Sequence, residues 1–67
     1  MTYQLTDEYI ELYKLIKILA LVDSGAEAKQ IIEQEHVFRN GELETRKRAK
    51  IRSGETITIA DIVINVI

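Results

Sequence analysis

Ser-Gly-Ala-Glu-Ala-Lys-Gln-Ile-Ile, residues 24–32, contains the clearest helix start signal in the chain. Ser24 and Glu27 have the S-x-x-E spacing of a capping box, in which each side chain accepts a hydrogen bond from the backbone amide of the other residue. The residues that then recur on one side are Ala28, Ile31, Ile32 and Glu35. This spacing predicts a helix over about 24–35 whose alanine and isoleucines form the inner face.

The preceding segment predicts a second amphipathic helix, over about 11–21. Its apolar residues fall at i, i+3, i+4 and i+7, and they are Leu12, Leu15, Ile16 and Leu19. Glu11 stands where a negative charge favours a helix N-terminus. Only a short break, residues 21–25, separates the two helices, so they must pack against each other.

The second half of the chain predicts β-strands joined by tight turns. Val37-Phe38-Arg39 leads into Asn40-Gly41, the dipeptide that best tolerates positive φ in a hairpin turn. A further turn is expected at Ser53-Gly54. The segment Thr56-Ile57-Thr58-Ile59 alternates, which places Ile57 and Ile59 on the core side of a strand.

Two more strands complete the expected sheet. The last strand alternates so that Ile62, Ile64 and Val66 share one face, and Ala60-Asp61 is the expected turn before it. Residues 2–5 are expected to form a short edge strand. The sequence therefore predicts an α+β fold, a single domain over 1–67 with two packed helices on a small, twisted, mostly antiparallel sheet.

Composition excludes several classes of function. The chain has 67 residues, which leaves little core to wall a deep substrate cavity, and no Cys, which excludes disulfides and thiolate metal sites. His36 has no further metal ligand at a suitable spacing. Glu42, Glu44 and Glu55 have no nucleophile beside them. We therefore expect no catalytic residues, no enzyme activity, no small-molecule substrate, no metal and no cofactor.

No segment predicts a membrane location. The apolar run over residues 18–22 is far shorter than the roughly 20 residues that span a bilayer. The first residues carry Asp7 and Glu8 and no basic stretch, so no signal peptide is expected. The expected location is the cytoplasm.

Positive charge is concentrated in one segment, residues 46–52, called the basic run below. It reads Arg-Lys-Arg-Ala-Lys-Ile-Arg and holds five of the nine positive charges and none of the eleven negative ones. The rest of the chain carries a net −7, so the overall −2 hides a strongly dipolar distribution. A local patch of this kind, and not the net charge, determines what binds against it.

The order of these features resembles that of a known family. The matching residues are Leu15, Lys17 and Leu19, then Ser24-Gly25-Ala26-Glu27-Ala28-Lys29, Val37, Asn40-Gly41, Glu44-Thr45-Arg46-Lys47-Arg48 with Lys50, and Gly54-Glu55-Thr56-Ile57. In this order the chain resembles the αL-motif RNA-binding domain named after ribosomal small-subunit protein four. It is most similar to the free-standing, single-domain bacterial members of the YbcJ/YaaA type, over about residues 10–60.

The resemblance implies a non-catalytic, monomeric protein that binds structured RNA, of the ribosomal or transfer RNA kind, through backbone phosphates. It places two helix lysines beside the basic run, across a shallow groove. The implied RNA-binding residues are Lys17, Lys29, Arg46, Lys47, Arg48, Lys50 and Arg52. Roles for Lys14, Arg39 and Ser24 in contacting RNA stay open.

The chain also departs from the family pattern. Gly25 stands where many members have an Arg, and Glu11-Leu12-Tyr13 stands where many have Arg-Leu-Asp, so two usual RNA contacts are absent. The strand before Asn40 usually alternates apolar-polar-apolar. Here it reads Val37-Phe38-Arg39, so the apolar and polar residues at positions 38 and 39 are exchanged. A local bulge or a register slip there would swap the faces of the strand.

Simpler roles compete with RNA contact at several residues. Tyr3, Tyr9, Tyr13 and Phe38 could stack on bases, but packing in the core and at sheet edges is the expected role. The basic run could instead dock an acidic protein, with an exposed strand edge accepting a partner strand. The alternative function is therefore a protein-interaction module.

Overall fold

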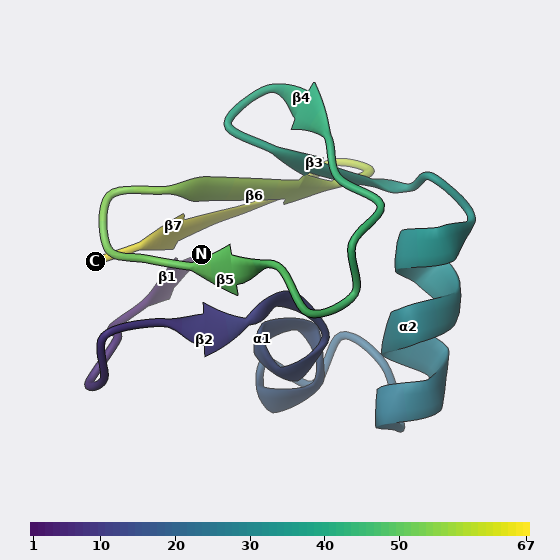
Figure 1. Ribbon diagram of the computed structural model, residues 1–67, viewed down its shortest axis with the longest axis horizontal. Helices are drawn as coiled ribbons and strands as arrows, with labels where there is room; N and C mark the ends of the chain where they lie inside the picture. Colours follow the sequence, from purple (N-terminus) through teal and green to yellow (C-terminus); the bar gives the residue numbers. More distant parts are fainter.

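The computed structural model describes all 67 residues and contains two helices and seven short strands (Figure 1). The helices are α1 (Leu12–Ile18) and α2 (Gly25–Glu33). The strands are β1 (Thr2–Tyr3), β2 (Ile10–Glu11), β3 (Val37–Arg39), β4 (Glu42–Leu43), β5 (Lys50–Ile51), β6 (Thr56–Ile59) and β7 (Ile62–Val66). The predicted α+β class is confirmed.

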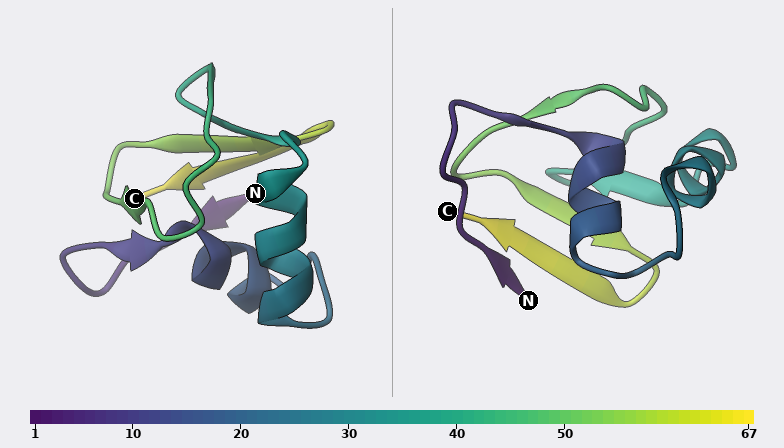
Figure 2. Two further views of the ribbon diagram at one scale, coloured as in Figure 1. Left: turned by 45° about the vertical axis from the view of Figure 1, so that its right-hand side comes forward. Right: turned by 90° about the horizontal axis from the view of Figure 1, so that it is seen from below.

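The strands form two sheets. The larger has the order β1-β7-β6-β3-β4, antiparallel throughout except for the parallel pair β1–β7. The smaller is the antiparallel pair β2–β5, which joins the segment before α1 to the end of the basic run. The two helices lie on the same side of the larger sheet, and the basic run passes beside the start of α1 (Figures 1 and 2).

Both helices end earlier than the sequence predicts. The first spans 12–18 and not 11–21, because Leu19 is its C-cap and Ala20 takes a left-handed backbone with φ of 57°. The second ends at Glu33, and Glu35 has φ of 65°, so the expected place of Glu35 in the helical stack is wrong. Ser24 is the N-cap and accepts a bond from the amide of Glu27, but the reciprocal bond of the capping box is absent.

One hydrophobic core joins the helices to the sheets. Its twelve residues are Leu12, Leu15, Ile16, Ala28, Ile32, Val37, Ala49, Ile51, Ile57, Ile59, Ile64 and Val66. The predicted inner faces of both helices and of β6 and β7 are therefore confirmed, with Leu19, Ile31 and Ile62 only partly buried. A helix of seven residues, as α1 is, would not persist in water alone, so this packing stabilises it.

Strand β3 keeps a regular register without a bulge. Val37 pairs with Ile59 and Arg39 with Ile57, so residues 37 and 39 share the inner face and Phe38 points outward. The apparent exchange at 38–39 is therefore not a slip. An arginine occupies the inner position and makes ion pairs there, as described below.

The predicted turns are all present. Asn40 and Gly41 both have positive φ, 52° and 86°, as a two-residue hairpin turn of the mirror-image type requires. Ala60 supplies the positive φ, 54°, in the turn between β6 and β7. Asn40 also ties its turn to β6, since its side-chain oxygen accepts a bond from the amide of Thr56 at 2.9 Å.

Candidate nucleic-acid interface

The basic run is attached to the start of α1 through its backbone. The amides of Leu12 and Tyr13 donate to the carbonyls of Ala49 and Lys47 at 2.9 and 3.0 Å. The first amides of a helix have no partner within the helix, so these bonds satisfy them. The run is fixed in place by this attachment and by the pairing of β5 with β2 (Figure 2).

Alternation in the run separates anchoring residues from presented ones. Ala49 and Ile51 are buried in the core, whereas Lys50 and Arg52 on either side of Ile51 are exposed. Ile51 therefore points inward between two outward cations, as the alternation of a strand requires. The cations are therefore held on a fixed backbone and not on a flexible tail.

Tyr13 is the meeting point of cations from three segments, called the Tyr13 cluster below. The charged groups of Lys29, Arg48 and Lys14 lie 4.7, 5.8 and 5.9 Å from the centre of its ring. They come from α2, from the basic run and from α1. Each distance is within cation–π range. The structure thus brings Lys29 and Arg48 of the basic run to the same tyrosine ring.

A second tyrosine, Tyr9, lies near two further cations of the run, whereas Arg46 and Lys47 make no cation–π contact with either ring. Lys50 and Arg52 lie 5.1 and 5.7 Å from the centre of the Tyr9 ring. The two rings therefore divide the patch into two parts. The hollow in the surface beside Tyr9 is also lined by Asp7, Glu8 and Glu11, so this second part is close to negative charge.

The cations of the patch differ in how far acids offset their charge. Four of them have an acid at close range, Lys14 with Glu11, Arg46 with Glu44, Lys47 with Glu33 and Arg52 with Glu8. Arg48 approaches Glu11 only at 3.9 Å and is mostly exposed. Lys17, Lys29 and Lys50 have no ion pair. A surface pair of this kind is weak, but the local acid still lowers the attraction for an anion.

Lys17 lies apart from the basic run. With Tyr13, Lys14 and Ile18 it lines a hollow on the exposed side of α1, called the helix hollow below. No contact joins it to residues 46–52. It reaches the patch only by way of Tyr13, which belongs to both the helix hollow and the Tyr13 cluster.

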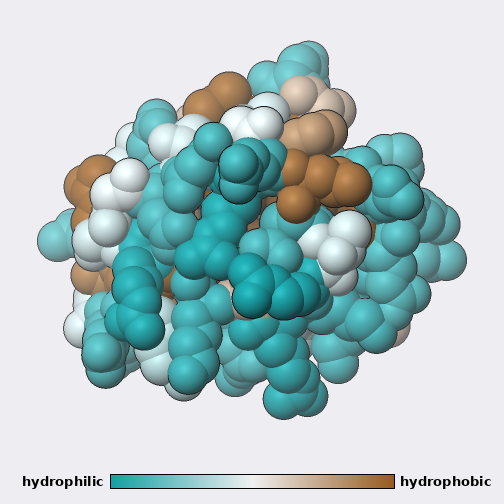
Figure 3. All heavy atoms as spheres, turned by 45° about the horizontal axis from the view of Figure 1, so that its top comes forward, coloured by the Kyte–Doolittle hydropathy of each residue, from teal (hydrophilic) through white to brown (hydrophobic).

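The structure gives no support for the shallow groove expected between the helices and the basic run, since none of the three hollows in the surface is lined by residues from both. The pair of backbone bonds described above brings the run directly against the start of α1. Figure 3 shows a face that is mainly hydrophilic, with apolar side chains gathered in the upper part of the view and on its left.

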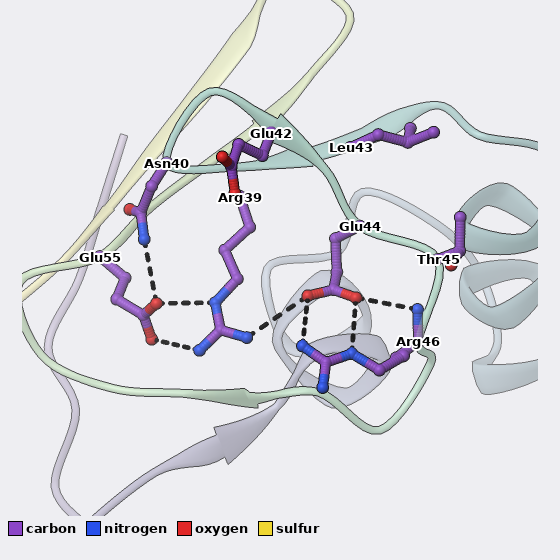
Figure 4. A pocket seen from close by; sticks show the side chains of 8 residues that line it. All are labelled: Arg39, Asn40, Glu42, Leu43, Glu44, Thr45, Arg46 and Glu55. Carbon is purple, nitrogen blue, oxygen red and sulfur yellow. Dashed lines mark hydrogen bonds and ion pairs between the residues drawn. The ribbon is translucent and has the colours of Figure 1, made fainter.

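Arg39 is a residue whose role the sequence left open, and the structure places it in a charged network (Figure 4). Its guanidinium donates to both carboxylate oxygens of Glu55, at 2.7 and 3.0 Å, and to Glu44 at 3.3 Å. It also donates to the carbonyl of Lys50 at 2.8 Å. Arg46 contacts Glu44 from the other side, at 3.1 and 3.2 Å.

This network strongly perturbs its carboxylates. The bonds from Arg46, together with those from Arg39, lower the pKa of Glu44 from 4.5 to about 2. Arg39 likewise lowers the pKa of Glu55, and the acids raise the pKa of Arg39. Both carboxylates are ionised at neutral pH and occupied by guanidinium groups. Neither is placed to exchange protons with a substrate.

Other kinds of site find no support in the geometry. No three His, Asp or Glu side chains lie together where they could hold a metal ion. Neither helix has the length and apolar character needed to cross a membrane. The interpretation therefore depends on the cations and the two tyrosines.

Fold and patch together define a class of protein. A family model described as the S4 domain matches residues 3–67, and the chain belongs to this family. YbcJ of Escherichia coli strain K12 is 39% identical over 59 residues, which cover 88% of this chain and 84% of that protein. YbcJ of Shigella flexneri matches to the same extent.

A solved structure gives the same relationship. The solution structure of Escherichia coli YbcJ has a TM-score of 0.76 and 37% identity, over 98% of this chain and 85% of that one. It is described as revealing an αL motif involved in RNA binding. The resemblance expected from the sequence, to the αL family and to YbcJ, is confirmed.

Proposed function

We propose that this protein is a non-catalytic RNA-binding protein that contacts the phosphates of structured RNA through the patch around Tyr13 and the basic run. The observation that carries the proposal is the convergence of Lys29, Arg48 and Lys14 on one tyrosine ring from three separate segments. Membership of the S4 domain family and the αL motif described for YbcJ support it. The proposed ligand is structured RNA of the ribosomal or transfer RNA kind. The protein would bind it as a monomer in the cytoplasm.

A fixed patch of this kind binds polyanions for a general reason. Each phosphate neutralised by Lys or Arg releases condensed counterions, so affinity arises largely from the number of contacts. Because the backbone of the run is already ordered, less conformational entropy is lost on binding than with a mobile segment. The acidic remainder of the chain, with its net −7, would repel RNA that does not present phosphates to the patch.

The ion pairs predict unequal contributions from the seven candidate residues. Lys29, Arg48 and Lys50, which have no acid closer than 3.9 Å, should contribute most. Arg46, Lys47 and Arg52 must share their charge with an acid already in contact. Lys17 should contribute only to an RNA that extends over α1.

The test is a salt titration with a structured RNA hairpin, read by fluorescence anisotropy. If four or five phosphates are engaged, log K should fall with log salt at a slope of about −3 to −4.5. A slope near zero, or no binding at low salt, would exclude backbone recognition. Tight binding to an acidic protein without RNA binding would favour the interaction-module alternative.

Two double variants provide a matched comparison within the patch. Lys29→Ala with Lys50→Ala and Lys47→Ala with Arg52→Ala each remove two positive charges, so their net charges are equal. The first pair should weaken binding more and reduce the salt slope by up to about two units. Equal losses would show that only total charge matters and that the local acids have no effect.

A further inference from the structure

The helix hollow on α1 combines apolar and cationic side chains, and binding to RNA phosphates alone would not use the apolar ones. Its lining consists of Tyr13 and Ile18, which give an apolar floor, and of Lys14 and Lys17. It has a volume of about 410 Å³ and contains no acidic lining residue. Ile18 is 60% exposed, which is unusual for an isoleucine on a short amphipathic helix.

We propose that the helix hollow binds one unpaired nucleotide of the RNA, with its base stacked on Tyr13 against Ile18 and its phosphates at Lys17 and Lys29. This inference rests on the proposed function and narrows its ligand to structured RNA that carries a bulged or looped-out base. A base is a flat apolar surface next to a negative phosphate, and an apolar floor beside lysines is complementary to it.

The Tyr13 ring is positioned for this role. Gly25, at the start of α2, lies close to the ring, since a Cβ there would come within 3.8 Å of two ring carbons, so a larger side chain at this position would cover part of it. The backbone of Tyr13 is fixed by its bond to the carbonyl of Lys47. The cations around the ring belong to long side chains, and base–aromatic stacking is the stronger interaction, so a base can displace them toward its own phosphates.

The hollow beside Tyr9 offers a comparison within the same chain. It also combines a tyrosine with apolar residues, and Lys50 and Arg52 lie near its ring. The two hollows adjoin, since Lys14 and Ile18 line both, and the Lys14 ammonium is paired with Glu11 on the Tyr9 side. However, the Tyr9 hollow is lined by Asp7, Glu8 and Glu11, which repel a nucleotide phosphate. Charge therefore favours the helix hollow over the Tyr9 hollow as the nucleotide site.

The experiment compares two RNA hairpins that differ only in one unpaired 2-aminopurine. The bulged hairpin should bind about tenfold more tightly than the fully paired one, and stacking should quench the 2-aminopurine fluorescence on binding. Tyr13→Leu should remove both the preference and the quenching, whereas Tyr13→Phe should retain them. Tyr9→Leu is the matched control and should leave the preference unchanged.

A second variant keeps the test decisive if Tyr13→Leu does not fold. Ile18→Ser changes an exposed residue that lines both hollows, so its effect is compared with that of Tyr9→Leu. It should lower the preference without changing the fold, checked by circular dichroism. Equal affinity for the two hairpins, or a preference that survives both variants, would overturn the nucleotide site while leaving phosphate recognition intact. Failure to bind either hairpin at low salt would overturn the proposed function as well.

Discussion

At the scale of single residues, Arg39 is a cation that stabilises the fold and is not part of the exposed cationic patch. Its side chain is only 22% exposed and its donors are occupied by Glu55, Glu44 and the carbonyl of Lys50. The guanidinium thus joins β3 to the segment after β4, to β5 and to the turn before β6. Removing it would leave the partly buried Glu55 without its guanidinium partner and Glu44 with Arg46 alone, which is costly.

The same network predicts how stability depends on pH. The folded pKa of Glu44, about 2, is below its ordinary value of 4.5, so its ionisation stabilises the fold above pH 4.5, and this contribution is lost as the pH falls from 4.5 toward 2. The shift corresponds to at most about 3 kcal/mol, and screening around the exposed Arg46 reduces this to roughly 1–2 kcal/mol. The free energy of unfolding, from urea titrations at pH 7, 4.5 and 2.5, should therefore decrease toward acid.

Glu44→Gln is the variant that isolates this effect. It should be less stable than the natural protein at pH 7 and should lose much of the pH dependence below 4.5, with a remainder from Glu55, whose pKa is also lowered. Glu42→Gln, an exposed acid two residues away without an ion pair, is the control. An unchanged pH profile in Glu44→Gln would show that the network does not stabilise the fold.

Sequence reasoning could not have found this network. Arg39 meets Glu44 and Glu55 across separations of 5 and 16 residues, and only the register of β3 with β6 brings them together. The one signal was the misplaced arginine in Val37-Phe38-Arg39. It indicated a departure from the usual strand pattern but not the partners that make the departure favourable.

At the scale of elements, the start of α2 was predictable because its cap is local. Ser24 is at the N-cap position and its hydroxyl accepts the Glu27 amide at 3.2 Å, as the spacing indicated. The end of α1 was not predictable from the sequence. Leu19-Ala20-Leu21 contains no helix breaker, and Ala20 adopts its left-handed backbone because the chain must turn toward α2. Strand β2 was not predicted either, because a strand of two residues is too short to show an alternating pattern in the sequence.

The cap can be tested on stability directly. Ser24→Ala removes the only side-chain acceptor at the start of α2 and should lower the free energy of unfolding by about 0.5–2 kcal/mol. Ser53→Ala makes the same change at an exposed turn residue that has no side-chain hydrogen bond, and should have little effect. Equal denaturant midpoints for Ser24→Ala and the natural protein would contradict the role of the cap.

At the scale of the whole molecule, the protein displays a cationic surface on an acidic chain. The basic run supplies the charge, α1 fixes its backbone through two hydrogen bonds, and α2 adds Lys29 across the Tyr13 ring. The family resemblance pointed to Lys29 beside the basic run but not to Tyr13 as the ring around which cations gather, and Lys17 lies apart. The pair of Arg46 with Glu44 is local, but the other pairs could not be predicted, because Glu8, Glu11 and Glu33 are distant in sequence from the run.

The central claim is that the folded surface, and not the basic run by itself, binds RNA. The most direct measurement is the affinity of the intact protein and of a free peptide of residues 44–54 for the same RNA hairpin, at matched salt. The peptide carries the five cations of the run but lacks Lys29, Tyr13 and the bonds that order it. We expect the intact protein to bind at least about tenfold more tightly, since its cations are already ordered. A peptide that binds as tightly as the intact protein would contradict the account.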